Sequence, residues 1–176
     1  MSKEYFCFEE EDGKTAFLCG VIDVLSDDLE MYLDFGSALD ADVFYIKNNA
    51  TGLLDDAVKK RLNKYNECNL TEQQDRLKIK IDAVKFELEK IEGNAEQYFC
   101  ETLSKASKNS DIFKAANKFL RAVNWYLGEP AGLYRPVNMP DKNIGVLGEI
   151  YLYTAWNYFF IRYEEYMLLV ILGTVE

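Results

Sequence analysis

The chain has 176 residues, 49% of them apolar and 28% charged, which is typical of one globular domain rather than a disordered segment. It contains no histidine, which excludes Ser-His-Asp and Cys-His catalysis and any zinc site with an imidazole ligand. The net charge of −10 lies in the first third: residues 1–56 hold 14 acids and 3 bases, a net of −11, whereas residues 57–176 hold 16 acids and 17 bases.

Residues 1–50 form a strand-rich acidic part in our interpretation. Tyr5 to Phe8 and Thr15 to Leu25 are two apolar runs. Between them lies Asp12-Gly13, a pair typical of a type I′ hairpin turn because both residues tolerate positive φ. The sequence therefore predicts a β-hairpin at this end of the chain.

Two more strands are predicted before residue 50. Leu29 to Phe35 alternates apolar and polar residues with a period of two, which predicts a strand with one buried face. Val43 to Ile46 is predicted to be a fourth, short strand. One alternative remains open: Ser26 is also suited to cap a helix that begins at Asp27.

Residues 53–127 are predicted to be helical, beginning with a short helix from Leu54 to Tyr65. Thr71 to Gln74 forms a capping box and starts the next helix. Gly93-Asn94 offers a stop or kink, and Ser110 caps a last helix closed by Gly128. An apolar seam follows the capping box at spacings of three and four, made of Leu77, Ile81, Val84, Leu88 and Ile91. We prefer packing within the domain to the alternative of a coiled-coil dimer, because the seam spans only about two heptads.

Residues 128–148 hold all three prolines and four of the ten glycines, which predicts a loop. Residues 149–173 are predicted to form a hairpin whose second strand, Tyr166 to Leu172, is apolar on both faces, as in a sheet covered on both sides. A buried helix is the alternative here. The predicted core includes Ile81, Leu88, Leu120, Trp156 and Leu169.

The predicted fold class is α+β in a single domain spanning 1–176. We expect a mixed or antiparallel sheet from the N-terminal strands and the C-terminal hairpin, packed against the central helical block.

No motif indicates a cofactor or metal site. The glycines form neither a G-x-G-x-x-G nor a Walker pattern, and the acids lack EF-hand spacing. No two of the four cysteines have a C-x-x-C spacing, so we interpret them as buried apolar residues. We therefore expect no cofactor and no bound metal.

The segment Tyr158 to Glu176 combines an aromatic strand, a Tyr-acid turn, an aliphatic strand and a Gly-Thr-Val-Glu tail. In this it resembles the closing hairpin of small bacterial immunity proteins, which neutralise toxins of polymorphic or contact-dependent systems. The match covers under a fifth of the chain and carries no site residues onto it. The resemblance implies a cytoplasmic α+β protein that acts by binding.

The charge asymmetry predicts a basic protein partner, because a negative field attracts basic surfaces and repels nucleic-acid phosphates. Our hypothesis is a protein inhibitor, either an immunity protein or a phage-encoded antagonist of a host defence system. An enzyme that uses carboxylates, with or without a metal, is the second hypothesis. The contacts that we predict are Asp23, Asp27, Asp28, Glu30, Asp34, Asp40 and Asp42.

We expect neither direct nucleic-acid binding nor membrane insertion. No basic segment followed by an apolar run opens the chain, and its longest apolar run has seven residues, against about 20 needed to span a bilayer. The expected location is the cytoplasm, and the expected state is a monomer or a dimer.

Overall fold

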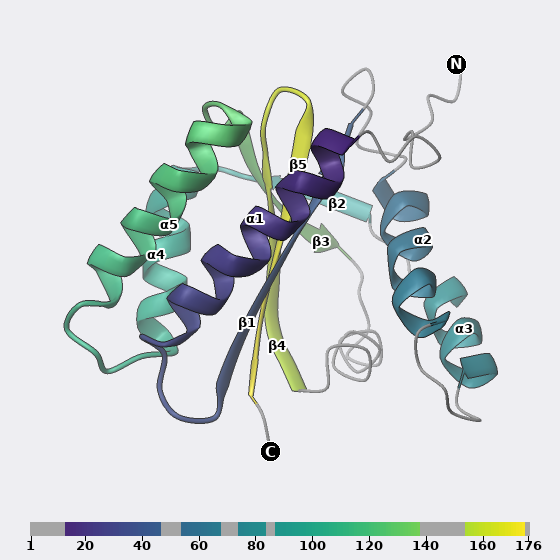
Figure 1. The fold of residues 1–176 in the computed structure, drawn as a ribbon, viewed down its shortest axis with the longest axis horizontal. Helices are drawn as coiled ribbons and strands as arrows, with labels where there is room; N and C mark the ends of the chain where they lie inside the picture. Colours follow the sequence, from purple (N-terminus) through teal and green to yellow (C-terminus); the bar gives the residue numbers. More distant parts are fainter. Residues whose placement is uncertain (1–12, 47–53, 68–73, 84–86, 138–153, 175–176) are drawn as a thin grey trace.

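The computed structural model describes residues 13–46, 54–67, 74–83, 87–137 and 154–174 (Figure 1). In chain order the elements are α1 (Gly13–Glu30), β1 (Ser37–Tyr45), α2 (Leu54–Glu67), α3 (Gln74–Ala83), β2 (Glu87–Ile91), α4 (Ala95–Lys105), α5 (Ile112–Leu127), β3 (Gly132–Val137), β4 (Thr154–Arg162) and β5 (Tyr166–Thr174).

These strands form one antiparallel sheet with the order β1-β5-β4-β3-β2. A tight turn joins β4 to β5, where the backbone N–H of Tyr163 donates to the carbonyl of Tyr166 at 2.8 Å. β5 then pairs with β1 on its other side, from Ser37 opposite Thr174 to Tyr45 opposite Tyr166. The α+β class and the C-terminal hairpin are confirmed, and the hairpin shares its sheet with a strand of the acidic first third.

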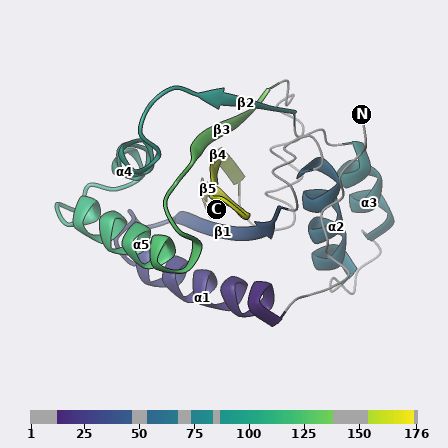
Figure 2. The same cartoon turned by 90° about the horizontal axis from the view of Figure 1, so that it is seen from above.

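The helices α1, α4 and α5 cover one face of this sheet, and Figure 2 shows them on the same side of it. Aromatic rings fill the space between these helices and the strands. Phe99 of α4 stacks on Phe119 of α5 with ring centroids 5.3 Å apart, and Phe159 of β4 meets Phe99 edge-on at 6.1 Å. Such ring pairs have a preferred geometry and add to the stabilisation from burying apolar area. They hold α4 and α5 together as a helical layer packed on β4.

The opposite face of β5 is buried as well. Met167, Leu169 and Ile171 alternate with the residues that face α1, α4 and α5, yet each is fully buried. The prediction of a strand apolar on both faces is therefore confirmed. α2 and α3 lie side by side, apart from the other three helices in both views, and their buried apolar residues include Val58, Leu62 and Ile81 (Figures 1 and 2).

The segment 13–30 is a helix, and the hairpin and strand predicted there are wrong. Gly13 begins the helix instead of forming a turn. Ser26 does not cap a helix start; its hydroxyl donates to the carbonyl of Ile22, 2.8 Å away in the preceding turn. The buried positions recur at intervals of three and four, which is one helical face: Thr15, Leu18, Ile22, Ser26 and Leu29.

The strand predicted from Leu29 to Phe35 is also wrong. Leu29 lies in the last turn of α1, and residues 31–36 form the turn that leads into β1. Phe35 is fully exposed there, so the alternation of apolar and polar residues does not reflect a buried strand face. Of the short strand predicted from Val43 to Ile46, residues 43–45 belong to the longer β1, which ends one residue before Ile46. The strand predicted from Tyr5 to Phe8 lies outside the described residues.

The apolar seam is divided between a helix and a strand. α3 ends at Ala83, whereas Leu88 and Ile91 lie in β2, where Leu88 is opposite Pro136 of β3. The prediction of one continuous helix is therefore wrong, and the interrupted seam offers no face for a coiled coil. Asn94 does not stop a helix but begins α4, because its side chain accepts from the backbone N–H of Gln97 at 2.9 Å.

The end of α5 matches the prediction, since Gly128 closes it with a φ of 91°. Its N-cap is Asp111, however, and not Ser110. The predicted loop 128–148 is wrong for residues 132–137, which form β3 between β2 and β4; residues 138–148 lie outside the described ones. Among the predicted core residues, Ile81, Leu120 and Leu169 are buried, Leu88 is half-buried, and the side chain of Trp156 is not among those described.

Replacing Leu168 of β5 with alanine should lower the free energy of unfolding by about 2–5 kcal/mol, because a fully buried side chain leaves a cavity. Leu88→Ala should cost less, since that side chain is only half-buried. Ile79→Ala, at a position 71% exposed on α3, is the control and should change stability by no more than about 0.5 kcal/mol. Urea unfolding measures all three, and equal losses for Leu88→Ala and Leu168→Ala would contradict the assignment of β2 to the sheet edge.

Candidate protein-binding site

The structure distributes the predicted contact acids over α1, β1 and the turn between them. Asp23, Asp27 and Glu30 share one side of α1, at intervals of four and three residues. The backbone N–H of Leu39 in β1 donates to the carboxylate of Glu30, which places this side of the helix next to the strand. These three acids are called the acidic flank below.

The carboxylates of the acidic flank disfavour one another's charge. Partial burial raises the pKa of Asp23 above its ordinary value, the charges of Asp42 and Asp27 raise it further, and Arg61 acts in the opposite sense. Partial burial also raises the pKa of Glu30; the hydrogen bond from Leu39 acts in the opposite sense, and the charge of Asp27 makes a smaller contribution that raises it. Burial and like charge both oppose ionisation, so the fold keeps these groups charged at neutral pH at a cost in stability.

Asp42 is an interior residue and not a surface contact. Its side chain is 4% exposed and forms an ion pair with Arg61 of α2, with Oδ1 3.0 Å from Nη1. The same guanidinium donates to the carbonyl of Val43 at 3.5 Å and to Sγ of Cys19 at 3.4 Å, and it lies 5.4 Å from the centre of the Phe44 ring. Arg61 thus closes the outer edge of β1 and attaches α2 to both β1 and α1.

The other predicted contacts lie apart from the acidic flank. Asp34 accepts from the backbone N–H of Lys108 at 2.9 Å and ties the turn after α1 to the connection between α4 and α5. Asp40 is half-buried on β1. Asp28 is about 100° around α1 from Asp27, the angle between successive helical residues, and lines a small depression between α1 and α5.

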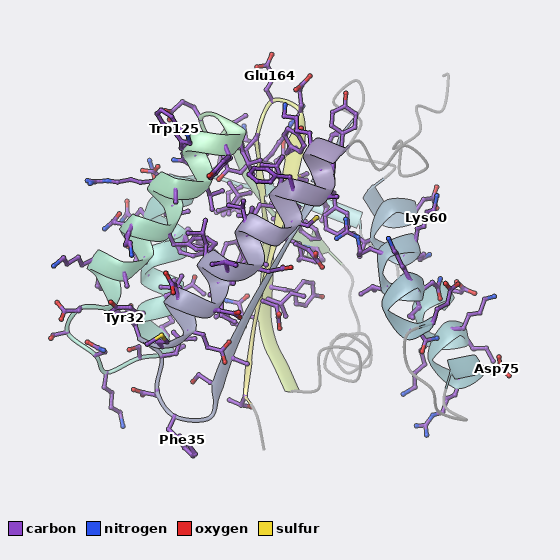
Figure 3. The ribbon with its side chains drawn as sticks, viewed as in Figure 1. Tyr32, Phe35, Lys60, Asp75, Trp125 and Glu164 are labelled. Atoms are coloured by element: carbon purple, nitrogen blue, oxygen red, sulfur yellow. The ribbon has the colours of Figure 1, made fainter. Side chains whose placement is uncertain are left out.

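Sequence analysis missed the outward side chains of α1 and α5. Phe17 and Val24 of α1 and Met31, the first residue after it, recur every seven residues and are 58%, 63% and 81% exposed. On α5, Trp125 is 84% exposed, and Figure 3 shows it at the outer side of this helix. The exposed residues of α5 also include the three bases Lys114, Lys118 and Arg121. The seven-residue spacing was visible in the sequence, but it marks one helix face only once the segment is known to be helical.

A partly buried series of hydrogen bonds links the C-terminal hairpin to α5 and α4. The Tyr163 hydroxyl donates to Oδ1 of Asn124 at 3.1 Å, and Nδ2 of Asn124 donates to Oε1 of Glu96 at 2.8 Å. Burial raises the pKa of the Tyr163 phenol, and the charges of Glu96 and Glu129 raise it further. The phenol therefore stays protonated as a hydrogen-bond donor, and this series of hydrogen bonds holds the hairpin in place rather than moving protons.

Burial also raises the pKa of the Cys100 thiol, in agreement with a packed cysteine rather than a reactive one. Over the described ranges of the chain, no group of three or more acids or cysteines is placed to hold a metal ion. None of the helices described is both long and apolar enough to cross a membrane. The chain matches no known family model, no curated protein and no solved structure.

Arg61→Met should lower the free energy of unfolding by about 3–5 kcal/mol, because Asp42 loses its buried cationic partner. The double variant Arg61→Met/Asp42→Leu removes both charges and should recover most of this loss. Thermal and urea unfolding compare the two. Equal losses for the single and double variants would show that the pair is not the source of the effect.

Asp23→Asn should raise stability at neutral pH by a few tenths of a kcal/mol, up to about 0.5, because solvent screens a carboxylate at the surface. The folded state raises the pKa of Asp23, so the wild type gains stability as pH falls through the carboxyl range and the neutral amide does not. The advantage of the variant should therefore vanish by about pH 3. Asp28→Asn is the matched control, and an equal pH-dependent gain there would contradict the crowding of the acidic flank.

Proposed function

We propose that this chain is a protein inhibitor of the immunity-protein class, which neutralises a basic partner protein by binding it through the acidic flank. The observation that carries this proposal is the crowding of Asp23, Asp27 and Glu30 beside β1, with raised pKa values at two of the three. Perturbed carboxyls gather preferentially at functional sites. A lysine or arginine from a partner reduces the repulsion among these three carboxylates. Binding therefore recovers the free energy that the repulsion costs the folded protein.

Two features of the sequence support the same class of function. The net charge of −11 over residues 1–56 attracts a basic partner to the third of the chain to which the acidic flank belongs. The hairpin from Tyr158 to Glu176 resembles the closing hairpin of small bacterial immunity proteins. A function by binding also needs no imidazole, in agreement with a chain that has no histidine.

The test is the association rate with the protein encoded by the gene adjacent to this one, measured between about 0.05 and 0.5 M salt. The triple variant Asp23→Asn/Asp27→Asn/Glu30→Gln should associate about tenfold more slowly than the wild type at low salt and show a flatter salt dependence. In a co-expression assay, the wild type should restore the growth of cells that express the partner, and the triple variant should do so less well.

The control variant Asp75→Asn/Glu92→Gln/Glu164→Gln removes the same number of charges from exposed positions outside α1 and β1. It should slow association much less than the triple variant of the acidic flank. If both variants slow association equally, net charge alone sets the rate. If neither does, the acidic flank is not the interface.

A further inference from the structure

The outward residues of α1 and α5 form one continuous face, because the two helices lie side by side and run antiparallel (Figure 1). Phe17 near the start of α1 meets Tyr126 near the end of α5, with ring centroids 6.0 Å apart. At the opposite end, a depression of about 160 Å³ between the helices is lined by residues of both, among them Asp28, Met31, Tyr32 and Lys118. The combined surface is called the α1–α5 face below.

The α1–α5 face has one acidic half and one basic half. Of the four acids of α1, Asp28 lies on this face and Asp27 at its border, whereas α5 contributes three bases and no acid. Asp28 lies on the acidic half, and Lys114, Lys118 and Arg121 lie on the basic half. Within the described part of the chain no ion pair engages these four side chains. Exposed apolar residues lie on both halves: Phe17 and Val24 on α1 with Met31 directly after it, and Trp125 on α5.

We propose that the α1–α5 face binds a second copy of this chain, with a two-fold axis that runs between the two copies and parallel to the helices. Rotation about such an axis stacks α1 of one copy on α5 of the other, and the reverse, in one isologous contact. Each acidic half then covers a basic half. An axis perpendicular to the helices in the same plane would stack α1 on α1 and set acid against acid, which costs affinity.

The same axis also sets the contacts along the helices. A rotation about an axis parallel to the helices does not shift a residue along the direction of that axis. Two residues that are neighbours across α1 and α5 within one copy therefore also meet between the copies, the residue of α1 from one copy and the residue of α5 from the other. The Trp125 end of α5 therefore meets Phe17 of the partner copy, and Lys118 meets Asp28. Aromatic side chains are the usual anchors of protein interfaces, so Trp125 and Phe17 form the apolar anchor and the charge pair fixes the register.

The size of the face predicts a dimer of modest affinity. An 18-residue helix is about 27 Å long and two adjacent helices are about 20 Å wide, so each copy contributes roughly 500 Å². The total of roughly 1,000 Å² is at the lower limit for a specific interface. We therefore expect a dimer with a dissociation constant in the micromolar range that weakens as salt is added.

This contact leaves Asp23 and Glu30 of the acidic flank accessible. Asp23 lies on the side of α1 next to Cys19 and Arg61, and Glu30 shares that side, whereas Asp27 is three residues from Val24 and four from Met31 and so borders the α1–α5 face. Dimerisation and the binding of a basic partner therefore use different residues except at Asp27, and each is measured without the other.

Sedimentation equilibrium of the full chain, from about 1 µM to about 500 µM, is the first experiment. The wild type should dimerise over this range, and Trp125→Ser should weaken the dimer at least about tenfold, since each substitution acts twice in a symmetric contact. Ile79→Ser is the control, because Ile79 is also exposed but lies on α3. A wild type that stays monomeric throughout, or an equal effect of the two variants, would overturn the proposal.

The second experiment exchanges the charges. Asp28→Lys alone and Lys118→Asp alone should each weaken the dimer, because each sets like charges against each other. The double variant Asp28→Lys/Lys118→Asp restores opposite charges across the contact and should regain most of the wild-type affinity. Glu164→Lys, at the turn between β4 and β5, applies the same charge change as Asp28→Lys at a distance and should leave the dimer intact (Figure 3). A double variant no stronger than the singles would refute the predicted pairing.

Discussion

The double-sided burial of β5 is the constraint on which the rest of the fold depends. Met167 to Leu172 carry only apolar side chains, and each is buried whichever face of the sheet it points to. Burying a large aliphatic side chain contributes about 1.5–3 kcal/mol, so these six residues contribute on the order of 10 kcal/mol. That is comparable with the whole net stability of a typical domain. A fold that left either face of β5 in water would lose much of this amount. The strand must therefore lie inside the sheet, with neighbours on both sides and cover on both faces, and α1, α4 and α5 provide that cover on one face.

The position of the acidic flank follows from the same constraint. α1 packs along β1, the neighbour of β5 at the sheet edge, and this leaves one side of α1 next to the outer edge of β1, where Arg61 of α2 also lies. The register of β1 turns Asp42 to the other face, opposite Leu169, where an unpaired carboxylate would be costly. Arg61 pairs with this carboxylate and also donates to Sγ of Cys19 on α1. The carboxylates of Asp23 and Asp42 are consequently close enough to repel each other on either side of one guanidinium.

The sequence predicted the elements whose pattern is unambiguous over a sufficient length. The aliphatic run of β5 and the apolar face of α5 are long, and each is bounded by a turn or a glycine. α1 was missed because its buried face includes the polar residues Thr15 and Ser26, while Phe17 and Val24 on its exposed side, and Met31 directly after it, obscure the helical period of the apolar residues. The exposed apolar residues that obscured the helical pattern thus belong to the α1–α5 face. β2 was missed for a different reason. Leu88 and Ile91 fit a helical spacing, and only pairing with β3, more than forty residues away, makes them a strand. The acids of the candidate site were countable in the sequence, but the burial of Asp42 depends on a partner in another element.

The geometry of α1 also limits how the two proposed contacts combine. Asp23 and Glu30 of the acidic flank point away from α5, whereas the outward stripe of α1 belongs to the α1–α5 face, so a single helix presents two surfaces that adjoin at Asp27. In the dimer, the two-fold axis places the two copies of α1 on opposite sides of the contact. The two acidic flanks then point in opposite directions and cannot reach one basic site together. If both proposals hold, each flank would bind its own partner molecule. Dimerisation would then add no avidity for a monomeric partner and would increase apparent affinity only for partners that are themselves paired or densely displayed.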